Sequence, residues 1–163
     1  GCARGEEAVT LAIVLASHPV VGGWDWEILA TDVDEEALDE ARSGIYGKRA
    51  VASVPTEILG ARFTPRHDRF AIDPDLLARI NYQRLNLADP GNGYLEPPFD
   101  VIFLRNVLIY FSQARKRDIV ERIARCLNPG GHLFLGSTES MSGHEDLFEM
   151  RSIAGGLVYR LRR

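Results

Sequence analysis

Apolar residues at helical spacing alternate with short apolar runs along most of the chain. The helical spacing predicts three helices: one that carries Val9, Ile13 and Ala16, one over 35–42 capped by Asp34, and one over 113–127. The β-rich runs predict four strands of a main sheet, at residues 27–31, 81–87, 99–104 and 132–136.

Residues 45–79 interrupt this alternation with prolines at 55, 65 and 74 and with dense charges. We expect an insertion here, with a small helix near 55–59 and a few short antiparallel strands. The chain is therefore predicted to be one domain over 1–163, in which 46–80 form an inserted β-subdomain.

Two more strands are predicted at 148–151 and 156–161, as an antiparallel hairpin on one edge of the main sheet. Strands that alternate with helices indicate a doubly wound α/β sheet. Such sheets bind ligands beyond the carboxyl ends of their strands. The candidate site should therefore lie at these ends.

Composition excludes several classes of protein. The 163 residues are 45% hydrophobic, which is ordinary for a globular domain, and the formal net charge of -4 argues against an electrostatic nucleic-acid binder. The apolar runs are too short to span a membrane. Two cysteines and four scattered histidines make no metal-ligand pattern, so no metal is expected and the cytoplasm is the predicted compartment.

The turn at Gly1–Glu7 leads directly into the first helix. Small residues would let a ligand approach the backbone, and Glu6 and Glu7 suit a positively charged ligand better than a phosphate. The plainer alternative is a simple helix start with two acids in its first turn. The dinucleotide pattern GxGxxG is absent, which disfavours a nicotinamide-dependent dehydrogenase.

Asp32 follows the predicted strand at 27–31 and comes about 25 residues after the turn. In nucleotide-binding α/β folds an acid at this place holds the ribose hydroxyls. One carboxylate can accept protons from both hydroxyls. Asp32 in isolation is also compatible with a turn residue, but together with the first turn it favours a binding site.

Polar residues follow two other predicted strands. Asn86 and Leu87, with Asp89 nearby, are of a kind that could hold an adenine by its edge and face, although many loops share this pattern. The strand at 99–104 leads to Arg105 and Asn106, and Tyr110 comes one helical turn later. Core packing and a role in the site are both open for Tyr110.

Six segments of the sequence together resemble the chemotaxis receptor methyltransferases, specifically the catalytic C-terminal domain of the CheR type. They appear in the family's order and span nearly the whole chain: GCARGEEAVTLAI, ILATDVDEEALDEARSGIY, NLAD, FDVIFLRNVLIYF, LNPGGHLFLGSTES and VYR. Arg4 departs from the family, whose members commonly have a small polar residue there.

The resemblance implies a class I, Rossmann-like methyltransferase fold with S-adenosylmethionine as methyl donor and S-adenosylhomocysteine as product. Its implied site residues are Glu7 and Asp32 for the donor, with Asp32 on the ribose, Asn86 and Leu87 at the adenine, Arg105 and Asn106 near the methionine end, and Tyr110 at the transfer centre. The acceptor would be a glutamate on the cytoplasmic helices of a methyl-accepting receptor, and the insertion would contact that receptor.

The family also has an N-terminal helical domain and a first sheet strand ahead of Gly1, which we expect to be missing from this chain. Loss of a central strand exposes unpaired edges, so the chain is expected to belong to a longer protein and to be inactive by itself. Two alternatives to receptor methylation stay open. One is a non-catalytic S-adenosylmethionine-binding sensor or scaffold, and the other is a class I methyltransferase with another substrate.

Overall fold

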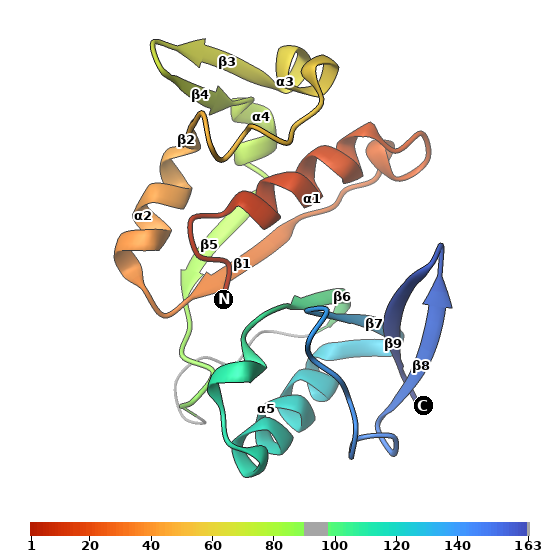
Figure 1. The fold of residues 1–163 in the computed structure, drawn as a ribbon. Helices are drawn as coiled ribbons and strands as arrows, with labels where there is room; N and C mark the ends of the chain where they lie inside the picture. Colours follow the sequence, from red (N-terminus) through yellow and green to blue (C-terminus); the bar gives the residue numbers. More distant parts are fainter. Residues whose placement is uncertain (90–97, 163) are drawn as a thin grey trace. The chain divides into compact units, whose positions relative to one another are not determined.

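A computed structural model describes residues 1–89 and 98–162 of the chain (Figure 1). It forms two compact units, one of Cys2–Leu85 and one of Asn86–Arg163 together with Gly1. Each unit has its own buried cluster of apolar side chains, and the two are described separately below.

The first unit begins with a helix on a short parallel sheet. Its elements are α1 (Glu6–Ser17), the 3-10 helix η1 (Val21–Gly23), β1 (Ile28–Asp32), α2 (Glu35–Ser43) and β5 (Ile80–Arg84). β1 and β5 pair in parallel, from Ile28 opposite Ile80 to Asp32 opposite Arg84. The predicted first two helices and the first two main strands are confirmed, each within a few residues of its expected bounds.

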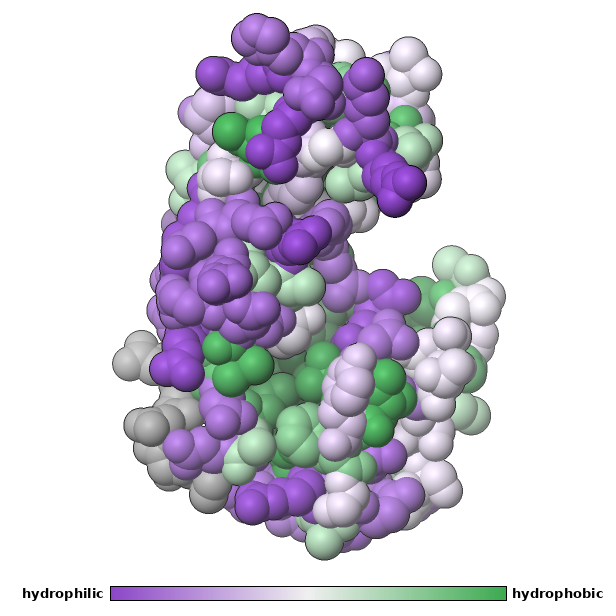
Figure 2. All heavy atoms as spheres, turned by 60° about the vertical axis from the view of Figure 1, so that its left-hand side comes forward, coloured by the Kyte–Doolittle hydropathy of each residue, from purple (hydrophilic) through white to green (hydrophobic). Residues whose placement is uncertain are grey.

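Between α2 and β5 the chain forms a small antiparallel sheet. It contains β2 (Ile45–Gly47), β3 (Phe63–Arg66) and β4 (Arg69–Ile72) in the order β2-β4-β3, with α3 (Thr56–Arg62) and α4 (Pro74–Leu77) beside them in sequence. The predicted short strands and small helix are therefore confirmed, while α4 was not expected. Figure 2 shows mainly hydrophilic residues on one face of this part of the molecule.

The small sheet shares its core with the rest of the first unit. Tyr46 and Phe63 are buried in the same cluster as Val9 of α1 and Leu38 of α2, and their rings meet edge to face with centroids 6.5 Å apart. Residues 46–80 are thus an insertion in sequence that packs as part of one core. Its division from the remainder as a subdomain stays a prediction.

The second unit is a mixed sheet with one long helix. Its elements are β6 (Phe99–Leu104), the 3-10 helix η2 (Leu108–Tyr110), α5 (Gln113–Cys126), β7 (Leu127–Leu135), β8 (Phe148–Ile153) and β9 (Gly156–Leu161). The strand order is β6-β7-β9-β8, with β6 and β7 parallel and the other pairs antiparallel. The predicted edge hairpin is confirmed as β8 and β9. Ile119, Val120 and Leu133 are fully buried between α5 and the sheet.

The start of β7 differs from the expectation of a strand over 132–136. The helix ends at Cys126 and the strand begins at once with Leu127, which lies opposite Phe99. The next matched pair is Val101 with His132, so the segment between forms an irregularity in the strand. The Asn128 side chain donates a 2.8 Å hydrogen bond to Asp100 across it. This bond and the pairing at Leu127 explain why the segment belongs to the strand.

Each unit contains a parallel pair of the predicted main strands, β1 with β5 in the first and β6 with β7 in the second. The parallel pairing within each unit is that expected of a doubly wound fold. The predicted loop at 89–98 lies mostly outside the described residues.

Asp34 caps α2 through its Oδ1 atom, which accepts hydrogen bonds from the amides of Glu36 at 3.0 Å and Ala37 at 3.3 Å. We expect Asp34→Ala to lower the free energy of unfolding by about 1 kcal/mol, because two amides of the first turn lose their acceptor. Urea unfolding followed by circular dichroism measures this. Asp39→Ala on the same helix removes only an exposed ion pair to Arg42 and should cost less than Asp34→Ala. Equal costs would contradict the capping role.

Candidate active site

The turn that precedes α1 is hydrogen-bonded to the carboxyl end of β1. The Cys2 amide donates to the Thr31 carbonyl at 2.8 Å, and the Ala3 amide donates to Asp32 Oδ2 at 2.8 Å. The Gly5 amide closes the turn onto the Cys2 carbonyl at 2.9 Å. Two of the predicted features, the turn and Asp32, are therefore in direct contact.

The Asp32 carboxylate is held by backbone amides on both oxygens. Oδ1 accepts from the Asp34 amide at 3.1 Å, and Oδ2 accepts from Ala3. Partial burial alone would raise the pKa of Asp32, but hydrogen bonds from the amides of Asp34, Ala3 and Val33, together with the positive charge of the N-terminus, hold the pKa below its usual value. The carboxylate is half-exposed and offers about four lone-pair sites in all, so it can accept a further hydroxyl proton beside these amides.

Gly5 has a conformation and a packing that exclude a side chain. Its φ is 84°, and a Cβ there would lie 2.7 Å from the Tyr82 hydroxyl oxygen and 3.0 Å from the Ala41 Cβ. Tyr46 lies beside it and donates to the Arg4 carbonyl at 3.4 Å. The turn therefore packs against the buried side chains of Tyr46 and Tyr82.

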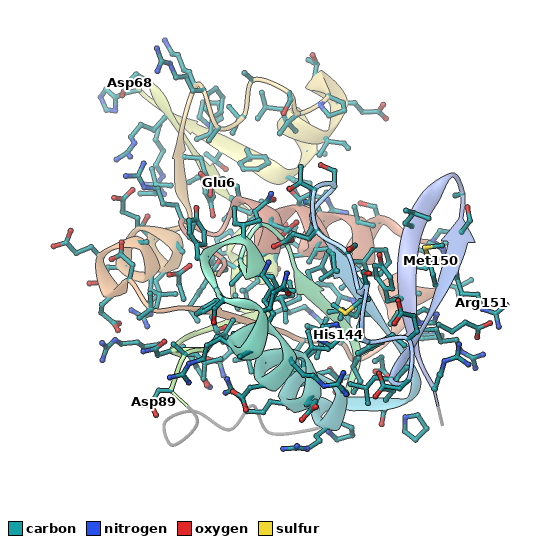
Figure 3. The ribbon with its side chains drawn as sticks, turned by 60° about the horizontal axis from the view of Figure 1, so that its bottom comes forward. Glu6, Asp68, Asp89, His144, Met150 and Arg151 are labelled. Atoms are coloured by element: carbon teal, nitrogen blue, oxygen red, sulfur yellow. The ribbon has the colours of Figure 1, made fainter. Side chains whose placement is uncertain are left out.

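Charged side chains surround the outer side of this turn. A cavity of about 440 Å³ lies there, lined in part by Arg4, Glu6, Glu40 and Arg69, and Arg4 forms an ion pair with Glu40 at 3.1 Å. Glu6, labelled in Figure 3, is the first residue of α1. Glu7 is half-buried in the first turn of α1.

Asn86 and Leu87 come directly after β5, at the start of the second unit. Asn86 is exposed, and its Oδ1 accepts a hydrogen bond from the Ala88 amide at 2.9 Å. Leu87 is half-buried against the second core, and its carbonyl accepts a hydrogen bond from Arg122.

Arg105, Asn106 and Tyr110 lie on the segment that follows β6. All three are exposed, and Tyr110 has 81% of its surface accessible, so core packing is excluded as its role within the described chain. Asn106 has a φ of 57°, a conformation that asparagine tolerates better than most residues. This segment carries the three residues on one short stretch of the second unit.

Glu139 is a neighbour of this segment that sequence reasoning missed. Its Oε2 accepts the Asn106 amide at 2.7 Å, and its Oε1 accepts the Leu108 amide at 2.8 Å. The signal available in the sequence was an acid a few residues beyond the end of a predicted strand, in the segment GSTES.

The described residues contain neither a metal centre nor a membrane span. No group of three histidine, cysteine, aspartate or glutamate side chains among them is placed to hold a metal ion. No helix in the described part of the chain has both the length and the apolar character needed to cross a bilayer.

Sequence comparison finds relatives across nearly the whole chain. The profile described as "CheR methyltransferase, SAM binding domain" matches residues 1–156. "Chemotaxis protein methyltransferase 2" of Vibrio cholerae is 36% identical over 152 residues, 92% of this chain and 53% of its own length. "Chemotaxis protein methyltransferase 1" of Pseudomonas aeruginosa is 37% identical over 99% of this chain and 60% of its own length. The "Chemotaxis protein methyltransferase" of Escherichia coli is 34% identical over 98% of this chain and 56% of its own length. The chain thus spans between about half and three fifths of the length of these relatives.

Structure comparison finds methyltransferases at low sequence identity. The magnesium protoporphyrin IX methyltransferase of Synechocystis, solved with bound S-adenosylmethionine, has a TM-score of 0.54 and 13% identity, covering 100% of this chain and 67% of that one. The S-adenosylmethionine-dependent methyltransferase SibL has a TM-score of 0.55 and 14% identity, covering 99% of this chain and 48% of that one. These likenesses confirm the predicted class I methyltransferase fold.

The two tyrosines under the turn make the first unit sensitive to alkali. Burial raises the pKa of Tyr82 from 10.0 to about 12 and raises that of Tyr46 as well. Above the ordinary tyrosine pKa the unfolded chain ionises while the folded chain does not. Stability should therefore be complete below pH 10 and fall as the pH rises to about 12. Urea unfolding at several pH values measures the loss.

Tyr82→Phe removes one of the two titrating hydroxyls and should retain more of its stability between pH 10 and 12 than the wild-type protein does. If both proteins lost stability in parallel over this range, the buried Tyr82 hydroxyl would not be the cause.

Proposed function

Because the chain belongs to the CheR methyltransferase family, we propose that the protein methylates glutamate side chains of methyl-accepting chemotaxis receptors, with S-adenosylmethionine as donor. The products would be glutamyl methyl esters and S-adenosylhomocysteine. The observation that carries this proposal is the family match over residues 1–156, supported by relatives that are named chemotaxis protein methyltransferases.

The donor residues follow from the chemistry of the side chains present. Asp32 is a half-exposed carboxylate with acceptor capacity left beside its backbone hydrogen bonds, which suits a ribose hydroxyl. Gly5 lets the turn pack closely on Tyr82 and Ala41, which fixes the turn beside Asp32. These features fit S-adenosylmethionine, so we assign Asp32 to its ribose and Glu7 to the same donor.

The second unit supplies the remaining proposed contacts. We assign Asn86 and Leu87 to the adenine, where an amide can bond the ring edge and an aliphatic side chain can cover a face. Arg105 and Asn106 are assigned to the methionine end, and the exposed Tyr110 to the transfer centre. An aromatic ring near a sulfonium cation gains a favourable electrostatic contact.

The reaction needs orientation more than it needs proton transfer. S-adenosylmethionine supplies an electrophilic methyl group on a sulfonium. A glutamate side chain, whose pKa in water is about 4.3, is already an anion at neutral pH, so no residue is assigned as a general base. Alignment of the acceptor by the protein can supply roughly 7–11 kcal/mol of the barrier reduction.

The partners would be the cytoplasmic helices of these receptors, which places the protein in the cytoplasm. The inserted sheet of residues 46–80 is the proposed receptor-contacting part, as the family resemblance implies. The remaining part of these relatives' chains lies beyond the matched region.

A transfer assay tests the proposed reaction. The protein with its upstream residues restored is incubated with S-adenosylmethionine labelled on its methyl group and a receptor cytoplasmic fragment, and calorimetry measures donor binding in parallel. We expect binding and a protein-bound label that base releases, because a carboxyl ester is hydrolysed by base. Binding without transfer would point to a sensor, a base-stable label would indicate another acceptor, and no binding would contradict the proposal.

Asp32→Ala tests the ribose assignment. We expect the affinity for S-adenosylhomocysteine to fall more than about tenfold, because hydrogen bonds to a charged group contribute about 1.5–3 kcal/mol each. Asp34→Ala is the matched control, since Asp34 is two residues away and its carboxylate caps α2. An unchanged affinity in Asp32→Ala, or an equal loss in the control, would remove Asp32 from the donor site.

A further inference from the structure

One carboxylate connects the segments that follow the two parallel strands of the second unit. Glu139 accepts hydrogen bonds from the amides of Asn106 at 2.7 Å, Leu108 at 2.8 Å and Gly136 at 2.9 Å. The Glu139 amide in turn donates to the Gly136 carbonyl at 3.0 Å, which folds its own segment into a turn. Glu139 is half-buried, so these bonds are partly shielded from water.

The end of a parallel ladder explains why an acceptor is needed here. The last matched pair of β6 and β7 is Leu104 with Leu135. Amides beyond this pair have no partner in the ladder, and unpaired backbone donors are costly when water is excluded. A carboxylate offers about four lone-pair sites and no hydrogen of its own, so it can serve all three amides. A glutamine has one acceptor oxygen and would turn an NH₂ group toward one of these donors.

Gly136 shows how closely the two segments approach. A Cβ at this position would lie 2.8 Å from Glu139 Oε2 and 3.0 Å from the Asn106 amide nitrogen. Contacts below 3.0 Å force a neighbour to move, so any larger residue would push the carboxylate away from Asn106. The glycine and the carboxylate therefore form one fitted arrangement.

We propose that Glu139 is a positioning residue for methyl transfer. It fixes the backbone on both sides of Val107, and so sets where the Asn106 side chain lies and where the 3-10 helix with Tyr110 begins. It acts through these backbone amides and through Asn106 and Tyr110. The inference rests on the proposed function, which assigns those two residues to the donor and the transfer centre.

Glu139→Gln tests the proposal in the transfer assay with a receptor fragment. We expect kcat to fall about tenfold or more, since displacements of about 1 Å at a reacting centre can cost up to about a hundredfold. The KM for the receptor fragment should stay within about threefold of the wild-type value, because Glu139 is not assigned to receptor binding. Hydrogen exchange should become faster at the amides of Asn106, Leu108 and Gly136.

Glu145→Gln is the matched control. Glu145 also accepts a backbone amide, that of Gly143 at 3.0 Å, but its bond closes a local turn away from the segment with Asn106 and Tyr110. We expect its kcat to equal that of the wild-type protein. A wild-type kcat in Glu139→Gln, or a loss of kcat that follows a lowered melting temperature in both variants, would overturn the proposal.

Gly136→Ala perturbs the same contact with the charge retained, and should also lower kcat, which covers the case that Glu139→Gln does not fold. If Gly136→Ala folded and kept the wild-type kcat, the fitted arrangement would have no role in the reaction.

A failure of the proposed function gives a different result, because the wild-type protein itself would then transfer no label. Hydrogen exchange at the amides of Asn106 and Leu108 is measured without a receptor fragment. Unchanged exchange in Glu139→Gln would therefore show that Glu139 does not fix these amides.

Discussion

Backbone amides just beyond the end of a parallel strand lose the neighbour that would accept their hydrogen bonds, and in this chain carboxylates take its place. At the end of β1, Asp32 accepts the amides of Ala3 and Asp34. Beyond β7, Glu139 accepts the amides of Asn106, Leu108 and Gly136. Both units therefore use the same physical solution at the same end of their parallel strands, which is the end where open α/β sheets bind ligands.

The two carboxylates differ in what they connect. Both oxygens of each carboxylate accept backbone amides, but the amides belong to different segments. Asp32 joins the turn before α1 to the end of its own strand, whereas Glu139 joins the segments that follow β6 and β7. A proposed binding group and a proposed positioning group thus share the same chemistry and the same place at the end of a strand.

Much of the fold was predictable because local patterns determined it. The run at Phe99–Leu104 is apolar except for Asp100 and is followed by the polar Arg105, and β6 has these bounds. Asp34 was identified as a cap because aspartate before an amphipathic segment can bond the first-turn amides. The helix α4 was missed because its four residues are too short for any periodicity. The start of β7 was missed because Asn128–Gly131 has the composition of a terminator, while the pairing of the flanking Leu127 and His132 with β6 and the Asn128–Asp100 bond keep it in the strand.

The site was predictable to the extent that strand ends identify it. Asp32 and Asn106 were proposed because each follows a predicted strand and topology brings such ends to one edge of a sheet. Glu139 also follows a predicted strand, but its role could not be inferred from that place alone, because its partner amide at Asn106 is 33 residues away and any residue type offers a backbone amide.

The shared core of the first unit limits how far its inserted sheet can be exchanged. Tyr46 of β2 is buried among residues of α1 and α2, and its hydroxyl is bonded to the Arg4 carbonyl in the turn beside Asp32. A sheet grafted from a relative would need an aromatic ring of the same shape, with a hydroxyl that can reach the Arg4 carbonyl. Otherwise the graft would leave a void under the turn. Recombination between relatives should therefore succeed at junctions that keep Tyr46 with its own α1 and α2, so that the proposed receptor-contacting sheet and the turn beside Asp32 are inherited together.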